Sequence, residues 1–430
     1  MSAVPTLGSW LDVAAIRALV VMVPVIVAAL LWWAVPDVRR RGAAVLALLW
    51  NLIGLTTVNA VAVAAGWWSF GTSGATLFGL PVDVVLGWAV LWSLVPVLAA
   101  RWVPTLYAVI GLVVLDLFVM PMLAPAVRLA PQWWIGEVLA VGACLIPGML
   151  LAWMTTDRRW LRVRVAMQVV LFAALLLVAI PAVAIELAGR SFAQVWSGVG
   201  GAVDVVVVQL IGLVALVALV AVMEFARHGG TPYPWDPPSR LVTSGPYAYV
   251  ANPMQLCGTV ILLLLAWMLW LPALAGAAVV AAAFSSGLAA YVENDSLGTR
   301  FGDSWAAYRK QVRAWWPRWR PIESEVPRRV YLARGCDPCS DLAAWIVERR
   351  PIGLEVLDAE DYGKPLRRMR YESSVIRYDG VRAFGMAVTH LNLVWAVVGW
   401  IVALPGIGHA LQVLVDAAGG GPWEVVREAG

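Results

Sequence analysis

Two cysteines near the C-terminus have the spacing of a reactive dithiol. The segment Cys336-Asp337-Pro338-Cys339 follows a predicted strand, Val330-Tyr331-Leu332, and opens a predicted helix that runs from Ser340 to Arg349. At a helix N-terminus the free N–H groups stabilise a thiolate, and two intervening residues leave the second sulfur within disulfide reach. We therefore predict that Cys336 is the reactive thiol and Cys339 the resolving one.

Metal binding is the alternative for this pair, because two thiolates could also be metal ligands. Further ligands would be needed close by, and in the tail only His390 and His409 could provide them. We therefore interpret the pair as a redox motif, either active or vestigial, and not as a metal site. The other cysteines, Cys144 and Cys257, fall in long apolar runs, which is typical of small packing residues.

A second set of residues that could do chemistry lies in a long loop, 224–253, and in the segment 293–317. The loop contains Gly245-Pro246-Tyr247-Ala248-Tyr249 and then Asn252-Pro253-Met254. Glycine, proline and aromatic residues at this density favour a fixed, irregular backbone that can approach a ligand closely. The alternative is a plain connector. Loops of this length are usually functional or disordered, however, and disordered loops lack such aromatic content.

The composition places these segments in a membrane protein. Hydrophobic residues make up 61% of the chain and charged residues 13%, a mixture that a single soluble core could not absorb. The apolar residues form runs of about 18 to 25, the length of a helix that crosses about 30 Å of hydrocarbon. We predict spans near residues 14–35, 43–64, 80–100, 103–124, 135–154, 165–187 and 203–224.

The next apolar stretch, from Met254 to Ala290, is about twice as long as one span and is broken at Leu271-Pro272. It predicts two helices in a tight hairpin, which brings the expected number of crossings to about nine. The first apolar run lacks the short apolar core and cleavage site of a signal peptide, so we expect it to be retained.

Arginine and lysine are expected in the cytoplasmic loops of a membrane protein. With the spans as drawn, most basic residues fall on one side, and Arg128 and Arg190 fall on the other. The basic side holds Arg39, Arg40, Arg41, Arg101, Arg158, Arg159, Arg162, Arg164, Arg227, Arg240, Arg300, Arg309 and Lys310. This predicts a multi-pass protein of the cell membrane, with the N-terminus outside and the C-terminal domain in the cytoplasm, where a cysteine pair stays mostly reduced.

Beyond Pro321 charges become frequent and apolar runs shorten, which indicates a small α/β domain in water. We expect a strand at Leu354–Leu357 and another at Val375–Tyr378 that enters a hairpin turn at Asp379-Gly380. The apolar run Leu391–Leu404 predicts a helix on a core or on the membrane surface, with a tenth crossing as the alternative. The expected fold is thus an all-α polytopic membrane protein followed by an α/β domain. The expected domains are 1–200, 201–320 and 328–425.

Residues 200–320 resemble the isoprenylcysteine carboxyl methyltransferase and phospholipid methyltransferase group of membrane enzymes. The resemblance rests on an ordered set of motifs around the hairpin, namely Gly245-Pro246-Tyr247, Asn252-Pro253-Met254, Glu293, Leu297, Phe301-Gly302, Tyr308 and Trp316-Pro317. Three positions depart from the family pattern: Ala251 stands for Arg, Asn294 for Glu and Trp305 for Tyr.

The resemblance implies a methyltransferase that uses S-adenosylmethionine and acts on a lipophilic acceptor in the bilayer, such as an isoprenoid or a phospholipid. The implied cofactor-binding residues are Gly245, Pro246, Tyr247, Tyr249, Asn252, Pro253, Met254, Glu293 and Leu297. Backbone N–H groups around Gly245 would suit the carboxylate of the cofactor, Glu293 its ammonium group, and the tyrosine rings its adenine or sulfonium. Neither a metal nor a nucleic acid is implied, and the oligomeric state is left open.

The alternative to an enzyme is a transporter or lipid-binding protein that keeps this fold without the chemistry.

A few single polar residues could also have a function. His228 could accept a proton near the loop, although a solvated helix end is the simpler role. Asp83 and Asp116 lie within apolar runs, where a carboxylate is costly and indicates a functional site or a buried partner. Arg101, at a span end, is expected to be an anchor rather than that partner.

The C-terminal segment, about 328–425, is similar to the DCC family of thioredoxin-like thiol-disulfide oxidoreductases. The strand, the Cys336-Asp337-Pro338-Cys339 motif and the following helix carry this resemblance. Ala333 stands where the family usually has Asp, and no proline stands just before Val375, where thioredoxins place their cis-proline. The resemblance implies a redox domain appended to the membrane region.

Overall fold

The computed structural model describes residues 7–9, 11–71, 74–323, 328–374, 376–419 and 421. This part of the chain forms two compact units. The first extends to Gly198 and takes in the segment Thr231–Asp236, and the second comprises Val199–Gly230 and the residues from Pro237 onward. The second unit therefore holds both the hairpin segment and the C-terminal α/β segment.

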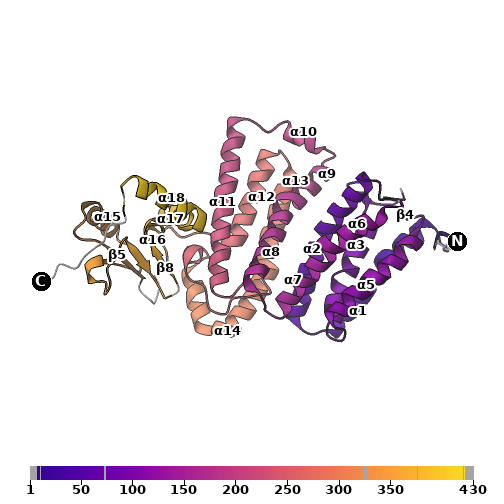
Figure 1. The fold of residues 1–430 in the computed structure, drawn as a ribbon, viewed down its shortest axis with the longest axis horizontal. Coiled ribbons are helices and arrows are strands. Elements are labelled where there is room, and N and C mark those ends of the chain that lie inside the picture. Colours follow the sequence, from indigo (N-terminus) through magenta and orange to yellow (C-terminus); the bar gives the residue numbers. More distant parts are fainter. Residues whose placement is uncertain are drawn as a thin grey trace. The chain divides into compact units, whose positions relative to one another are not determined.

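The first unit is a bundle of apolar helices (Figure 1). Its helices are α1 (Val13–Ala34), α2 (Val38–Ala64), α3 (Val82–Leu91), α4 (Leu94–Ala99), α5 (Thr105–Val119), α6 (Trp133–Ala140), α7 (Ile146–Thr156), α8 (Leu161–Ala174), α9 (Ile180–Leu187) and α10 (Phe192–Trp196). The π turns Val141–Leu145 and Leu175–Ala179 continue α6 into α7 and α8 into α9. Helix α2 packs against α3, α4, α6 and α7, and it therefore lies in the middle of the unit.

Local sequence explains where the first two helices start. Asp12 accepts a hydrogen bond from the backbone N–H of Ala15 at 2.7 Å, and Asp37 accepts one from that of Arg39 at 3.0 Å. Each aspartate thereby satisfies an N–H group that has no partner inside the helix. Short antiparallel pairs join the connections, β1 (Trp68–Phe70) with β4 (Val127–Leu129) and β2 (Thr76–Leu77) with β3 (Leu80–Pro81).

Within the described residues, seven helices are long and apolar enough to cross a membrane. They are Val13–Ala34, Val38–Ala64, Val82–Ala99, Thr105–Leu123, Trp133–Thr156, Leu161–Leu187 and Ala202–Arg227. Each coincides with one predicted span to within a few residues, so these seven predictions are confirmed. The chain thus has the helices of a multi-pass membrane protein.

In the second unit, α11 (Ala202–Arg227), α12 (Pro253–Met268) and α13 (Pro272–Phe284) pack in sequence order (Figure 1). The chain reverses just before Pro272, where the sequence predicts the hairpin. Helix α12 has 16 residues, or about 24 Å, which is shorter than a full crossing. By helix length the described residues give seven crossings, or eight if the bent pair near the C-terminus counts as one, against about nine predicted.

A π turn, Ser285–Ala289, leads from α13 into α14 (Ala290–Gln311). Helix α14 is kinked at Gly302, whose φ of 50° and ψ of −122° are not helical. Arg300 on this helix donates a hydrogen bond to the carbonyl of Pro238 at 2.9 Å, which ties α14 to the loop between α11 and α12.

The chain then forms a mixed sheet with strand order β6-β5-β7-β8. The strands are β5 (Arg328–Leu332), β6 (Leu354–Asp358), β7 (Arg370–Glu372) and β8 (Arg377–Asp379). Strands β5 and β6 run parallel and are joined by α15 (Asp337–Glu348), whereas β7 runs antiparallel to both β5 and β8. The predicted strands around Val330 and Leu354, and the helix between them, are confirmed.

The hairpin turn predicted at Asp379-Gly380 is wrong. The turn between β7 and β8 lies earlier, where the N–H of Ser373 bonds to the carbonyl of Ile376 at 2.9 Å. Gly380 instead starts α16 (Val381–Val388), and its φ of 61° turns the chain from the edge strand into that helix. Val375, where the predicted strand begins, lies outside the described residues.

Two further helices, α17 (Leu393–Ala403) and α18 (Pro405–Ala417), follow α16 and are bent by 86° from each other. Helices α16 and α17 cross in backbone contact, because a Cβ atom on Gly385 or on Gly399 would collide with the carbonyl of the other residue. Helix α17 also packs against α11. The apolar run Leu391–Leu404 thus forms a helix that packs on other helices of the second unit, and together with α18 it is also long and apolar enough for a bent crossing.

Candidate functional site

The cysteine pair lies where two parallel strands end and a helix begins. Strands β5 and β6 are parallel, so the loops that follow Leu332 and Asp358 leave from the same edge of the sheet. Cys336 is the residue that precedes α15, and its carbonyl accepts the N–H groups of Cys339 and Ser340, each at 2.9 Å. Both cysteines are free thiols and half-buried. This is the local setting that the sequence predicts for a reactive dithiol.

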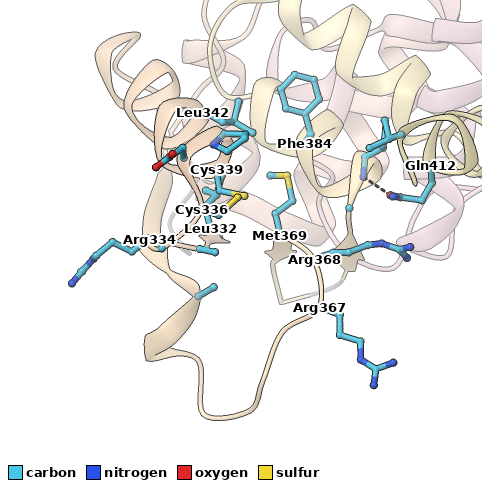
Figure 2. A pocket seen from close by; sticks show the side chains of 18 of the residues that line it. Leu332, Arg334, Cys336, Cys339, Leu342, Arg367, Arg368, Met369, Phe384 and Gln412 are labelled. Atoms are coloured by element: carbon cyan, nitrogen blue, oxygen red, sulfur yellow. Dashed lines mark hydrogen bonds between the residues drawn. The ribbon is translucent and has the colours of Figure 1, made fainter. Parts of the chain in front are cut away.

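A cavity of about 1330 Å³ opens beside the two sulfurs (Figure 2). Much of its lining is apolar, with Leu342 from α15 and Phe384 from α16. Figure 2 shows the side chain of Met369, the residue before β7, next to the cysteine pair, whereas Arg334 and Arg367 extend away from it. A cavity of this size admits a small organic group or a peptide side chain.

Gln412 of α18 holds one wall of this cavity in place. Its side-chain oxygen accepts the backbone N–H of Val381, the first residue of α16, at 2.8 Å (Figure 2). The amide nitrogen of Gln412 donates to Asp416 at 2.8 Å, and Asp416 also binds Arg368 at 2.6 Å. The C-terminal helix is therefore part of the cavity and not only an addition to the sheet.

Cys339 is held as a neutral thiol. Burial, followed by the hydrogen bond with Cys336 and the charge of that residue, raises the pKa of Cys339 to about 11. A hydrogen bond with the backbone of Ala333 opposes this shift only in part. Because its thiolate is scarce at neutral pH, Cys339 suits a resolving role more than an attacking one.

Glu360 positions the loop that precedes the pair, and sequence reasoning missed this residue. Its Oε1 accepts the backbone N–H of Arg334 at 2.8 Å and that of Gly335 at 3.4 Å. Its negative charge also disfavours a thiolate at Cys339. The sequence did contain a signal for this contact. Glu360 follows β6 and the cysteine loop follows β5, and the loops that follow two parallel strands leave the sheet at the same edge.

Of the two histidines named as possible metal ligands, His409 is exposed on α18 and His390 has other partners. His390 is buried, and its Nδ1 donates to the carbonyl of Ile352 at 2.6 Å. The hydroxyl of Tyr371 lies 3.1 Å from its Nε2. Burial, with the nearby charge of Arg328, lowers the pKa of His390 to about 3, so the ring stays neutral. Within the described residues, no group of three or more His, Cys, Asp or Glu side chains could hold a metal ion.

The Gly245-Pro246-Tyr247 motif forms a short 3₁₀ turn beside the end of α11. Gly245 has a φ of 59°, and a Cβ atom there would lie 3.3 Å from the side chain of Glu224. Glu224 is buried and binds Arg227 at 2.7 Å, and Arg227 donates to the hydroxyl of Tyr378 in β8 at 2.7 Å. These contacts fix the turn to α11 and α11 to the sheet.

Tyr247 and Met254 pack against the end of α11. The ring of Tyr247 stacks on Phe225 with 5.5 Å between centroids, and Met254 joins the same cluster. The carbonyl of Tyr247 accepts the hydroxyl of Tyr308, on α14, at 2.9 Å. The structure thus links the loop motif to the helix that carries the later part of the motif set.

Tyr249 faces the C-terminal helices. Its hydroxyl donates to the carbonyl of Thr389 at 2.7 Å, and its ring meets Trp400 of α17 edge to face at 5.5 Å. Ala248 and Ala396 complete this buried cluster. Tyr249 is therefore engaged by the C-terminal part of the second unit in this arrangement.

The remaining predicted cofactor-binding residues lie around the two ends of the hairpin. Pro246 and Pro253 are buried, and Pro253 begins α12. The N–H of Asn252 donates to the carbonyl of Ala314 at 3.2 Å. Leu297 is buried on α14. The backbone of Glu293 belongs to α14, but its side chain lies outside what the structure describes.

Among the acids predicted in the membrane helices, Asp83 has a partner from the first span. Arg17 donates to both of its carboxylate oxygens, with the closest contact at 2.7 Å. Arg17 lies near the start of α1, and the sequence alone does not identify it as the partner of Asp83. Arg101 is exposed at a helix end, where an anchoring residue is expected.

His228 caps the end of α11. Its Nδ1 lies 2.9 Å from the carbonyl of Glu224, so that nitrogen carries the proton, and its own carbonyl accepts the N–H of Ser239 at 2.8 Å. His228 thus occupies the end of a helix with its ring half-exposed, which is the simpler of the two roles considered for it.

Comparisons of the chain with protein-family models, with curated proteins and with solved structures find no match. Its function is therefore inferred from the side chains and their geometry.

Proposed function

We propose that the chain is a multi-pass membrane protein whose C-terminal domain catalyses thiol–disulfide exchange through Cys336 and Cys339. The observation that carries this proposal is the placement of both thiols at the start of α15, beside an open and largely apolar cavity. The connectivity supports it, because a β-α-β unit precedes an antiparallel strand pair and a helix, as in thioredoxin-like domains.

In the reduced protein, the Cys336 thiolate attacks one sulfur of a substrate disulfide and releases the other as a thiolate. Cys339 then loses its proton and attacks the Cys336 sulfur of the mixed disulfide, which releases the second substrate thiolate. The protein is left with a Cys336–Cys339 disulfide, and the substrate has gained two electrons and can take up two protons. The apolar lining of the cavity favours a disulfide with hydrophobic neighbours.

Alkylation of the reduced protein at graded pH tests the assigned roles. At neutral pH we expect the reagent to modify Cys336 before Cys339. The rate at Cys339 should rise about tenfold per pH unit until the pH approaches its pKa of about 11, because only the thiolate reacts. Peptide mass spectrometry gives the two rates, and the buried Cys257 serves as an internal control that should stay unmodified. Equal rates at Cys336 and Cys339 at neutral pH would contradict the assignment.

We also propose that the N-terminus lies outside the cell and the cysteine domain in the cytoplasm, because the basic residues gather in the loops on one side. A membrane-impermeant thiol reagent should then reach Cys336 only after the cells are permeabilised. Labelling of Cys336 in intact cells would contradict this orientation and place the cysteine domain outside the cell.

A second proposed activity of the same unit is methyl transfer from S-adenosylmethionine to a lipophilic isoprenoid or phospholipid acceptor. The observation that favours it is that the two segments with the methyltransferase-like motifs are hydrogen-bonded to each other. Besides the contact from Tyr308 to Tyr247, the N–H of Ala251 donates to the carbonyl of Arg313 at 2.9 Å. A protein that only binds or transports lipid is the alternative, and it needs no such cofactor.

Only some of the implied residues fit the cofactor in this arrangement. Tyr249 is engaged by Thr389 and Trp400, so its ring is not free to cover an adenine. The contacts would therefore come from the backbone of the Gly245 turn, which could hold a carboxylate, and from Glu293, which could hold an ammonium group. When bound, S-adenosylmethionine supplies an activated methyl group, and the residues of the chain only bind it and align the acceptor.

Titration calorimetry of the detergent-purified protein with S-adenosylmethionine tests this second proposal. We expect binding by the wild type and a loss of about 1.5–3 kcal/mol in Glu293→Ala, the range for a hydrogen bond to a charged group. Asp303→Ala, which removes an exposed acid from the same helix, is the matched control and should bind as the wild type does. An absence of binding by the wild type would favour the lipid-binding alternative, and an unchanged affinity in Glu293→Ala would remove this residue from the site.

A further inference from the structure

Two carboxylates lie inside the helix bundle of the first unit without a cationic partner among the described residues. Asp116, on α5, is fully buried, and its Oδ2 accepts the indole N–H groups of Trp92 at 2.7 Å and Trp88 at 3.4 Å. Its Oδ1 is buried without a hydrogen-bond partner. Glu137, on α6, is 6% exposed, and its Oε1 is also buried without a partner.

Glu137 borders a small cavity of about 30 Å³. Aromatic and aliphatic side chains from α2, β1, α3 and β4 form most of its wall, Trp68 and Trp88 among them. Asn59 also borders the cavity, but its amide is occupied: it accepts from the indole of Trp68 at 3.1 Å and donates to the carbonyl of Leu55 at 2.8 Å. The space has room for about one water molecule.

The two charged groups nearest to this cavity in the sequence of its wall elements, Asp83 on α3 and Arg128 on β4, are paired or exposed. Asp83, at the start of α3, is held through both oxygens by Arg17. Arg128, on β4, is exposed. Of the described side chains that line the cavity, Glu137 alone carries an acid or a base. No described cation is therefore available to neutralise the carboxylates of Asp116 and Glu137.

Two ionised carboxylates would be costly in this place. The charges of Asp116 and Glu137 repel each other, and unpaired charge is strongly disfavoured in the low-dielectric interior of a membrane bundle. The indole donors stabilise only one oxygen of Asp116. One proton on the pair would remove one of the two charges and turn a partnerless acceptor into a donor.

We propose that Asp116 and Glu137 form a proton-binding site inside the membrane bundle and that the pair carries one proton at neutral pH. A proton is the ligand that this site fits. A hard metal cation takes about six oxygen ligands, whereas the wall next to Glu137 offers mainly aromatic and aliphatic carbon.

Infrared spectroscopy of the purified protein in lipid tests this site, because a protonated carboxyl group has a carbonyl band that an ionised one lacks. We expect the wild type at neutral pH to show such a band, with the small shift in D₂O that marks an exchangeable proton. The double variant Asp116→Asn, Glu137→Gln should lose it. Asp83→Asn is the matched control and should leave the band unchanged, because Asp83, unlike the two buried acids, has a cationic partner in Arg17.

Three results would overturn the proposal. The band could be absent from the wild type at neutral pH, or it could persist in full in the double variant. It could also disappear when Na⁺ is added to the wild type at constant pH, which would make the pair a cation site. The sodium titration needs no variant, so the proposal stays testable if the double variant does not fold.

Discussion

The Asp236→Ala variant is expected to lower the free energy of unfolding of the first unit by about 3–5 kcal/mol, the cost of breaking a buried ion pair. The side chains of Asp236 and Arg164 are only 1% and 2% exposed, and Oδ2 of Asp236 lies 2.7 Å from Nη1 of Arg164. The hydroxyl of Thr231 adds a hydrogen bond to the same oxygen at 3.1 Å. Removal of the carboxylate would leave the buried guanidinium without its counter-ion.

Unfolding in a fixed detergent, by heat or by denaturant, measures this loss. Asp157→Ala removes an exposed carboxylate from the connection that precedes α8 and should change stability by no more than about 0.5 kcal/mol. The double variant Arg164→Met, Asp236→Leu should recover most of the loss, because no unpaired charge then remains buried. Wild-type stability in Asp236→Ala would mean that water or another group solvates Arg164.

The membrane helices could be predicted because their signal is local. A run of apolar residues has to cross the hydrocarbon as a helix, so run length alone locates α1, α2 and α11 to within a few residues. The partners of the charged residues are not local. Asp236 comes from a loop that follows α11, yet it pairs with Arg164 at the start of α8, and Asp83 pairs with Arg17 two helices earlier. Neither pair leaves a spacing pattern in the sequence.

The local setting of the cysteine pair was predictable for the same reason, since the strand, the motif and the helix are consecutive in the chain. Its other walls were not predictable, because Met369, Phe384 and Gln412 reach the cavity only through the order of the strands and the return of the C-terminal helices. Gly380 shows why the type of turn could not be predicted. An Asp-Gly pair predicts a positive φ, which Gly380 has, but a positive φ occurs in a strand-to-helix turn as well as in a hairpin.

The position of Tyr249 was also beyond sequence reasoning. The motif places it in a loop with Tyr247, and both aromatic rings are then expected at one site. In the structure the two rings point to different neighbours, Phe225 for Tyr247 and Trp400 for Tyr249. Because Trp400 lies far along the chain, only the folded second unit shows that Tyr249 contacts the C-terminal helices.

The two single cysteine variants are expected to fail at different steps of thiol–disulfide exchange. In a single turnover with an aromatic disulfide, the reduced wild type should release both thiol halves of the reagent and finish with its own disulfide. Cys339→Ser should release one half and keep the other bound to Cys336, because no second thiol is present to resolve the mixed disulfide. Cys336→Ser should react no faster than a variant without both cysteines, because burial keeps Cys339 protonated at neutral pH.

Absorbance of the released thiol gives the stoichiometry, and the mass of the intact protein shows the adduct. Cys257→Ser, which changes a buried thiol in α12, is the matched control and should behave as the wild type. Release of both halves by Cys339→Ser would mean that another thiol resolves the intermediate, and full activity in Cys336→Ser would make Cys339 the attacking residue. Either result would contradict the assigned order. The wild type distinguishes an exchange site from an inert pair, because an inert pair would release neither half.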